Sequence, residues 1–216
     1  MRPFILVLAG VNGAGKSSVG GSILQDHGLP WFNPDSYARE LVRELGMDAT
    51  EANARAWQYG KATLESSIVS GRNYAFETTL GGNTITALLS KAAQTHDVVM
   101  LYCGLSTPEL HMARVALRVA HGGHHIAEEK IRERWDTSRL NLIKLLPSLA
   151  RLQVFDNSAQ AQPGEDIPDP VLVLHVEDGR VFAPDLTDPA ALQAVPAWAR
   201  PVAEIGRAQR LNSSHQ

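Results

Sequence analysis

A glycine-rich segment near the amino terminus carries the clearest chemical pattern in the chain. Residues 10–17 are Gly-Val-Asn-Gly-Ala-Gly-Lys-Ser, which matches the P-loop pattern G-x-x-x-x-G-K-[S/T] in full. The glycines let backbone N–H groups face a chain of phosphates, and the start of the following helix adds partial positive charge. Lys16 would reach the β- and γ-phosphates, and the Ser17 hydroxyl would hold Mg²⁺. The pattern predicts a site for ATP or GTP. Its expected residues are Asn12, Gly13, Ala14, Gly15, Lys16, Ser17 and Ser18.

Acidic side chains follow two further predicted strands. Asp35 closes the short strand expected in WFNPD, and Glu77 ends the strand expected in NYAFETT. Because the carboxyl ends of parallel strands converge on a ligand crevice, both acids are expected near the γ-phosphate. Asp35 would accept the proton of an acceptor hydroxyl, with a helix-cap role as the alternative. An acid at the end of a parallel strand is unfavourable unless it meets a ligand, a metal or a cation, so Glu77 is expected to contact one of these. Thr79 could bind an oxygen-rich acceptor. Glu65 lies on the preceding helix, where an ordinary solvated glutamate is an equally good interpretation.

Arginines gather in the segment 114–139. Arg114 and Arg118 are four residues apart and share one helix face. A glycine pair at 122–123 breaks the helix, as a mobile lid requires. Such arginines would neutralise charge on a phosphoryl group in transfer. The alternative is a solvated basic face paired with Glu128, Glu129 and Glu133. The arginines concerned are Arg114, Arg118, Arg132, Arg134 and Arg139.

Three histidines, His121, His124 and His125, flank the glycine pair. No cysteine or acid completes a ligand set at zinc spacing, so a contact with phosphate or a capping role is favoured over a structural metal.

The elements that must position these residues alternate between strand and helix. Strands are expected at 4–9, 31–35, 73–79, 97–105 and 151–157, and helices at 16–27, 36–46, 50–70, 81–95, 108–120 and 127–146. This alternation predicts an α/β fold of the P-loop NTPase type, with a parallel sheet covered by helices on both faces.

The composition changes near residue 160, where AQAQPGEDIPDP forms a polar connection. Residues 171–184 alternate about Asp178-Gly179, which predicts a β-hairpin. The tail from about 188 is expected to form a short helix with a frayed end. The chain is therefore divided into a catalytic domain, 1–159, and a hairpin and tail, 160–216, that form an appendage of the same domain.

The overall composition is that of an ordinary globular protein. The formal net charge of −3 over 216 residues gives no bulk attraction to nucleic acid or to an anionic membrane. No run reaches the roughly 18 apolar residues that a membrane span requires. The single cysteine, Cys103, excludes an internal disulfide and is expected to be buried in a strand. A cytoplasmic location is therefore expected.

The class of nucleotide-binding protein follows from missing motifs. A GTPase needs a guanine-reading N-K-x-D segment, and a transporter ATPase needs a strand ending in Asp-Glu together with a signature such as LSGGQ. The sequence has neither, which favours a small-molecule kinase. The alternatives are a metabolite kinase with another acceptor and a nucleotide-dependent regulator that binds a partner through the hairpin at 171–184.

Several motifs extend this interpretation over residues 4–158. They are GVNGAGKSS, FNPDSYA, FETTLGG, TPEL, RVALRVAHGGHHI, IRERW, RLNL and FDNS. With these motifs the chain resembles the zeta-toxin family of P-loop kinases, in its compact chromosomal branch of predicted ABC-type ATPases. The resemblance implies an adenylate-kinase-like sheet and ATP-dependent phosphorylation of a sugar hydroxyl on UDP-N-acetylglucosamine or a related nucleotide sugar. It also implies a small separate antitoxin, which would block nucleotide binding, as a possible partner.

The resemblance also assigns roles to individual residues. Lys16 and Ser17 would serve ATP and Mg²⁺, Asp35 would deprotonate the acceptor, and Asn157 would lie beside the adenine. Acceptor-binding positions would be Glu65, Glu77 and Thr79, and a phosphate-binding arginine would be Arg114. A second lid arginine of the family is replaced near His124 or His125, so Arg118 or Arg134 would take its place.

Overall fold

The computed structural model describes residues 2–26, 30–121, 123, 125–160, 168–185 and 188–213. Its strands are β1 (Phe4–Ala9), β2 (Tyr74–Thr78), β3 (Asp97–Gly104), β4 (Arg151–Asp156), β5 (Val171–Glu177) and β6 (Arg180–Ala183). Its helices are α1 (Lys16–Asp26), α2 (Pro34–Leu45), α3 (Ala49–Ser70), α4 (Asn83–Ala92), α5 (Pro108–Ala120), α6 (Glu128–Leu145), α7 (Pro189–Ala194) and α8 (Arg200–Ser213), with a 3₁₀ turn at Leu146–Ser148.

These strands form one mixed sheet in the order β2-β1-β3-β4-β5-β6. The first four strands in that order are parallel, and β4, β5 and β6 pair antiparallel. The predicted α/β fold is thereby confirmed. The expected hairpin is also present, since β5 and β6 meet at Asp178 and Gly179, both with positive φ. The carboxyl ends of β1 and β2 therefore lie side by side, with Ala9 opposite Thr78.

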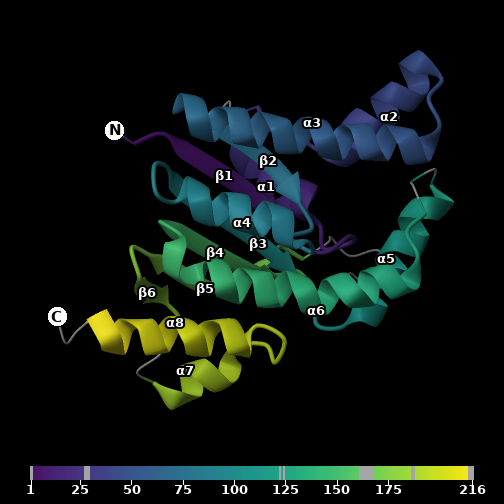
Figure 1. The fold of residues 1–216 in the computed structure, drawn as a ribbon. Helices are drawn as coiled ribbons and strands as arrows, with labels where there is room; N and C mark the ends of the chain where they lie inside the picture. The colour runs from purple at the N-terminus through teal and green to yellow at the C-terminus, as the bar shows by residue number, and fades with distance from the viewer. Residues whose placement is uncertain are drawn as a thin grey trace.

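Helices cover both faces of the sheet. Figure 1 shows α3, α4, α6 and α8 side by side across one face, with α1 behind the sheet. The larger core lies under these four helices and is formed by residues such as Leu64, Leu89, Leu142 and Val202. On the other face, Leu24 of α1 packs with side chains of β1 and β3. Burial of these apolar side chains drives the two layers together.

The prediction of a strand in WFNPD is wrong, because this segment forms only a single β-bridge. Only Phe32 pairs, through a parallel bridge to Phe76. The Phe32 N–H donates to the Ala75 carbonyl at 2.9 Å, and the Glu77 N–H donates to the Phe32 carbonyl at 2.9 Å. Pro34 follows two residues later, lacks an N–H and starts α2, so the pairing cannot continue.

The carboxyl-terminal tail is more ordered than the sequence suggested. Two helices, α7 and α8, replace the single short helix expected there. Trp198 and Val202 are buried in the core under α3, α4 and α6. The Trp198 ring lies so close to Gly104, at the end of β3, that a Cβ there would come within 2.2 Å of it. The hairpin and tail thus extend the sheet and core of the first 159 residues. In the described part of the chain, no helix is both long enough and apolar enough to cross a membrane.

Candidate active site

The loop between β1 and α1 has the geometry predicted for a P-loop. Gly10, Gly13 and Gly15 have φ values of 138°, 82° and 85°, a region that side chains other than glycine rarely adopt. A Cβ at Gly10 would lie 2.1 Å from the Cys103 carbonyl oxygen, and one at Gly15 would lie 2.4 Å from Nδ2 of Asn157. Only glycine fits at these two positions. We call residues 10–18 the phosphate cradle.

Further contacts fix the cradle in place. The Ala14 N–H donates to the Val11 carbonyl at 3.1 Å, and the Ser18 N–H donates to the Gly15 carbonyl at 3.1 Å in the first turn of α1. Nδ2 of Asn157 donates to the Ala14 carbonyl at 2.9 Å. Asn157 therefore lies beside the cradle, next to where a nucleotide would sit. The start of a helix presents backbone N–H groups and partial positive charge, so the cradle and the start of α1 together suit an anion.

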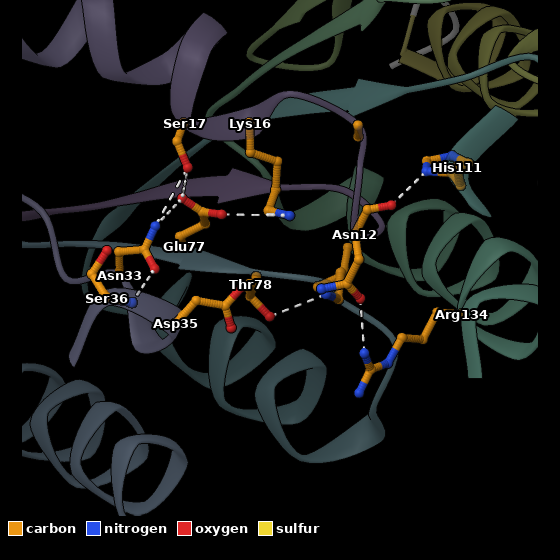
Figure 2. Close-up of polar contacts among 12 residues, drawn as sticks. Asn12, Lys16, Ser17, Asn33, Asp35, Ser36, Glu77, Thr78, His111 and Arg134 are labelled. Atoms are coloured by element: carbon orange, nitrogen blue, oxygen red, sulfur yellow. Dashed lines mark hydrogen bonds and ion pairs between the residues drawn. The ribbon is translucent and has the colours of Figure 1, made fainter. Parts of the chain in front are cut away.

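Lys16 and Ser17 meet Glu77 at the start of α1 (Figure 2). The Lys16 Nζ lies 3.5 Å from Oε1 of Glu77, and the Ser17 hydroxyl donates to Oε2 at 2.9 Å. Lys16 and Glu77 are almost fully buried, with side-chain exposures of 8% and 10%. The expected contact of Glu77 with a cation is present, although the family resemblance assigned this residue to the acceptor.

The oxygen atoms at this point suit a hard cation. Mg²⁺ prefers oxygen ligands and is usually held by one or two carboxylates together with substrate phosphates. Ser17 and Glu77 supply a hydroxyl and a carboxylate within hydrogen-bond distance of each other. Among the residues that the structure describes, no group of three or more His, Cys, Asp or Glu side chains forms a metal site by itself. A hydroxyl and a carboxylate are two of the oxygen donors that Mg²⁺ accepts, and nucleotide phosphates are the usual source of others.

Asn33 was missed by the sequence reasoning and connects the cradle to α2. Its Nδ2 donates to Oε2 of Glu77 at 2.8 Å, and its Oδ1 accepts the Ser36 N–H at 3.0 Å as the N-cap of α2 (Figure 2). Asparagine before a proline at the first helical position was the available signal. Because Asn33 makes the cap, the alternative in which Asp35 caps α2 is wrong.

Asp35 lies in the first turn of α2 with half of its side chain exposed. It lines a cavity of ≈660 Å³ that opens beside the cradle. Other lining residues come from the cradle, the end of β2, α3 and α6, and include Asn12, Glu77, Thr79, Trp57, Lys61, Lys130 and Arg134. Glu65 is not among them, and it forms an ion pair with one of them, Lys61, at 2.8 Å. The structure thus brings Asp35, Glu77 and Thr79 together and leaves Glu65 one helical turn away.

The three arginines predicted to serve phosphates lie on different sides of the site. Arg114 donates to the Ala159 carbonyl at 3.0 Å, and its partial burial lowers its pKa. Arg134 donates to Oδ1 of Asn12 at 2.8 Å (Figure 2). Arg118 lies 4.0 Å from Asp35. Arg134 thus contacts the cradle directly, whereas Arg118 faces the proposed base.

The remaining two arginines of the segment have structural partners. Arg132 pairs with Glu109 at 2.6 Å. Arg139 pairs with Asp136 at 2.6 Å and stacks 3.5 Å above the Trp135 ring. Neither arginine pairs with the glutamates expected in the basic-face alternative. Arg132 is half-exposed, but Arg139 is only 19% exposed, so for Arg139 the alternative of a solvated face is wrong.

His111 is a second residue that sequence reasoning missed. It is buried, and its Nδ1 donates to the Asn12 carbonyl at 2.8 Å. Burial lowers its pKa to about 4, because a charged imidazole would lose its hydration. His111 is therefore neutral near pH 7. The available signal was its place three residues before Arg114 on one face of α5.

The structure describes two of the three predicted histidines, His121 and His125. His125 lines the cavity, and His121 donates to the Leu117 carbonyl at 2.8 Å. His124 and Gly122 lie outside the described residues. Cys103 is buried in β3, as expected, and this burial raises the pKa of its thiol to about 12.

The comparisons with known proteins agree with this geometry. A family model described as AAA domain (AAA_33) matches residues 5–142. An uncharacterized protein of Haemophilus influenzae (strain Rd) is 29% identical over 142 residues, which make up 62% of this chain and 94% of that protein.

Two solved structures share the fold at low sequence identity. AvrRxo1-ORF1 in complex with AvrRxo1-ORF2 and sulphate ions has a TM-score of 0.63 and 17% identity, over 91% of this chain and 64% of that one. The same pair has also been solved with ATP. The PezAT chromosomal toxin-antitoxin system of Streptococcus pneumoniae has a TM-score of 0.57 and 18% identity, over 98% of this chain and 87% of that one. Family, fold and cradle together support a phosphotransferase.

Proposed function

The chain belongs to the AAA_33 family of AAA domains, and from this premise we propose that it is an ATP-dependent kinase acting on a hydroxyl of a nucleotide sugar such as UDP-N-acetylglucosamine. One observation carries the proposal. A half-exposed carboxylate, Asp35, lines a cavity of ≈660 Å³ that also reaches Asn12 of the cradle and Glu77. A hydroxyl compound in this cavity would have a proton acceptor on one side and the phosphate cradle on the other.

On the nucleotide side, the chain supplies charge and hydrogen-bond donors. The cradle would bind the phosphates, and Lys16 would exchange its contact with Glu77 for the β- and γ-phosphate oxygens. Ser17 and Glu77 would hold Mg²⁺, which neutralises charge as the phosphoryl group leaves ADP. Asn157, next to the cradle, would flank the nucleoside.

On the acceptor side, positioning matters more than base strength, because phosphoryl transfer passes through a loose transition state. Asp35 would accept the hydroxyl proton while Thr79 orients the acceptor. Trp57 offers an aromatic face to a planar or apolar part of the substrate. Arg134 would neutralise the transferring phosphoryl group from the cradle side, and Arg114 would do so from α5.

A small separate antitoxin is proposed as the partner. Support comes from two structural neighbours that were solved as two-component assemblies, one of them described as a toxin-antitoxin system. A kinase that consumes ATP is expected in the cytoplasm.

The proposed activity can be tested by ³¹P NMR of the purified protein with ATP, Mg²⁺ and a panel of nucleotide sugars, free sugars and nucleosides. We expect a new phosphomonoester signal with UDP-N-acetylglucosamine or a close relative. The Lys16→Ala variant serves as the blank. Release of ADP and free phosphate at the same rate with every acceptor, and no new ester, would argue against a small-molecule kinase.

A further inference from the structure

A second, smaller cavity adjoins the acceptor cavity. Its volume is ≈290 Å³, and its floor is formed by Ala38 and Val42 of α2 and Ala49 of α3. Asp35 and Asn53 line both cavities. The carboxylate proposed as the base therefore stands where the two cavities meet, and neither the cradle nor the acceptor cavity explains why the second one is there.

Three guanidinium groups surround the smaller cavity. Arg39 and Arg43 are four residues apart on one face of α2, and Arg118 approaches from α5. Among the described residues that line it, Asp35 is the one carboxylate. The lining therefore carries net positive charge, which favours an anion inside the cavity.

Arg118 has donors that its protein partner does not satisfy. Its Nη1 lies 4.0 Å from Oδ2 of Asp35, which is long for an ion pair. Its Nε is buried and has no hydrogen-bond partner among the described residues. A buried N–H without an acceptor is unfavourable, and a phosphate oxygen would satisfy it.

The two arginines of α2 make contacts that an incoming anion can replace. Arg39 donates to the Ser36 hydroxyl at 3.0 Å, and Arg43 pairs with Glu44 at 2.9 Å. Both contacts are exposed to solvent, where such pairs contribute little stability.

We propose that the smaller cavity is an anion subsite that binds a phosphate group of the acceptor. The inference deepens the proposed kinase function and rests on it, because the acceptor hydroxyl would lie at Asp35 while its phosphate contacts Arg39, Arg43 and Arg118. Guanidinium groups bind phosphate oxygens in pairs, which fixes orientation as well as charge. The acceptor is then a phosphate-bearing hydroxyl compound, and Arg118 serves the acceptor rather than ATP.

The subsite can be tested without turnover. The cradle is first filled with a non-hydrolysable ATP analogue and Mg²⁺, so that added anions cannot bind there. Inorganic phosphate is then titrated while ¹⁵N NMR follows the arginine Nε resonances. We expect a saturable shift of the Arg118 signal, and at least about tenfold weaker binding in the Arg39→Gln/Arg43→Gln variant, which keeps Arg118 as the reporter. The matched control is Arg55→Gln, an exposed arginine of α3 that pairs with Glu51. It should bind phosphate like the wild type.

A second titration distinguishes a phosphate group of the acceptor from a free anion. UDP-N-acetylglucosamine and N-acetylglucosamine 1-phosphate should shift the Arg118 signal at lower concentration than inorganic phosphate, and the uncharged N-acetylglucosamine should not shift it. The absence of a saturable shift, or equal phosphate binding by the double variant, would overturn the subsite. Binding of inorganic phosphate without tighter binding of either sugar phosphate would overturn its assignment to the acceptor. These titrations measure binding and not phosphoryl transfer. The ³¹P experiment therefore tests the kinase activity independently of the subsite.

Discussion

The nucleotide end and the acceptor end of the site are built in different ways. At the nucleotide end, Asn12, Lys16 and Glu77 are buried, Lys16 pairs with Glu77, and Asn12 accepts a hydrogen bond from Arg134. At the acceptor end, Asp35 and Trp57 come from two helices, α2 and α3, and are about half-exposed, and Thr79 follows β2. The backbone and the lysine that bind phosphate are therefore contiguous in the chain, whereas the choice of acceptor depends on how separate elements are placed around it.

The largest effect is expected at the nucleotide end. Lys16→Ala removes the buried cation of the cradle and leaves Glu77 without its ionic partner. We expect phosphoryl transfer to fall about 10³-fold, or roughly 4 kcal/mol in the barrier, because charge on the transferring group is no longer neutralised. The rate of ester formation by ³¹P NMR measures the effect.

Lys91→Ala is the matched control, since Lys91 is exposed in the last turn of α4, away from both cavities. It should transfer phosphate at the wild-type rate. If Lys16→Ala retains more than about a tenth of the activity, Lys16 is not what neutralises charge in the cradle. The nucleotide end would then be no more sensitive to substitution than the acceptor end.

The same contrast explains what the sequence could predict. The cradle was identified in full because its strand, glycines, lysine and helix are contiguous in the chain, and each has a local physical reason. The parallel order of the first four strands followed from the alternation of strand and helix. The helix predicted over 108–120 is also present as α5, because its N-cap, Thr107, and Pro108 are neighbours in the sequence.

Contacts between distant segments were not predictable in this way. Nothing local places Glu77 against Lys16, which is 61 residues earlier, or Asn12 against Arg134, 122 residues later. The tail was underestimated because alanine and proline obscured a helical face on which Val202 and Ala203 are buried. Such contacts depend on tertiary packing, which single-sequence patterns do not contain.

The second prediction concerns the pH dependence of stability at the nucleotide end. The pKa of His111 is lowered from 6.5 to about 4 in the folded protein. Below pH 6.5 the unfolded chain binds a proton at His111 more readily than the folded protein does. Neutral His111 therefore contributes its full stability above pH 6.5, and this contribution is lost as the pH falls through 4. The loss from this one group should approach about 3 kcal/mol at pH 4.

Urea denaturation of the wild type and of His111→Gln between pH 7 and pH 4 isolates this contribution. The wild type should lose about 3 kcal/mol more than the variant over that range. His121→Gln, which alters an exposed histidine beyond the end of α5, should follow the wild-type curve. Parallel curves for all three proteins would show that His111 is not held neutral beneath the cradle.

The third prediction moves to the acceptor end. Asp35→Asn keeps the shape of the side chain but removes its capacity to accept a proton. We expect transfer to fall about 10²-fold, or roughly 2.7 kcal/mol, with ATP affinity unchanged, because Asp35 lies outside the cradle. Transfer is measured by ³¹P NMR and nucleotide affinity by calorimetry.

Glu40→Gln removes an exposed carboxylate from the same helix and should change neither quantity. Full transfer by Asp35→Asn would rule out Asp35 as the base. A large loss of ATP affinity in this variant would instead show that Asp35 also contributes to nucleotide binding, so that the acceptor end and the nucleotide end do not act independently.

The smallest effect is expected at Asn33, where the two ends are joined. Its Oδ1 caps α2 and its Nδ2 donates to Glu77, so one side chain links the helix of the base to the buried acid of the cradle. Asn33→Ala should lower the free energy of unfolding by about 1 kcal/mol through loss of the cap. Asn33→Ser should restore most of that stability, since serine also caps helices but is too short to reach Glu77. Urea denaturation measures the first effect, and the Mg²⁺ concentration for half-maximal transfer measures the second. If Asn33→Ser matches the wild type in both, the Asn33–Glu77 bond does not couple the two ends. If it recovers stability but needs more Mg²⁺, then the orientation of the acceptor helix and the ion site depend on one another through this single amide.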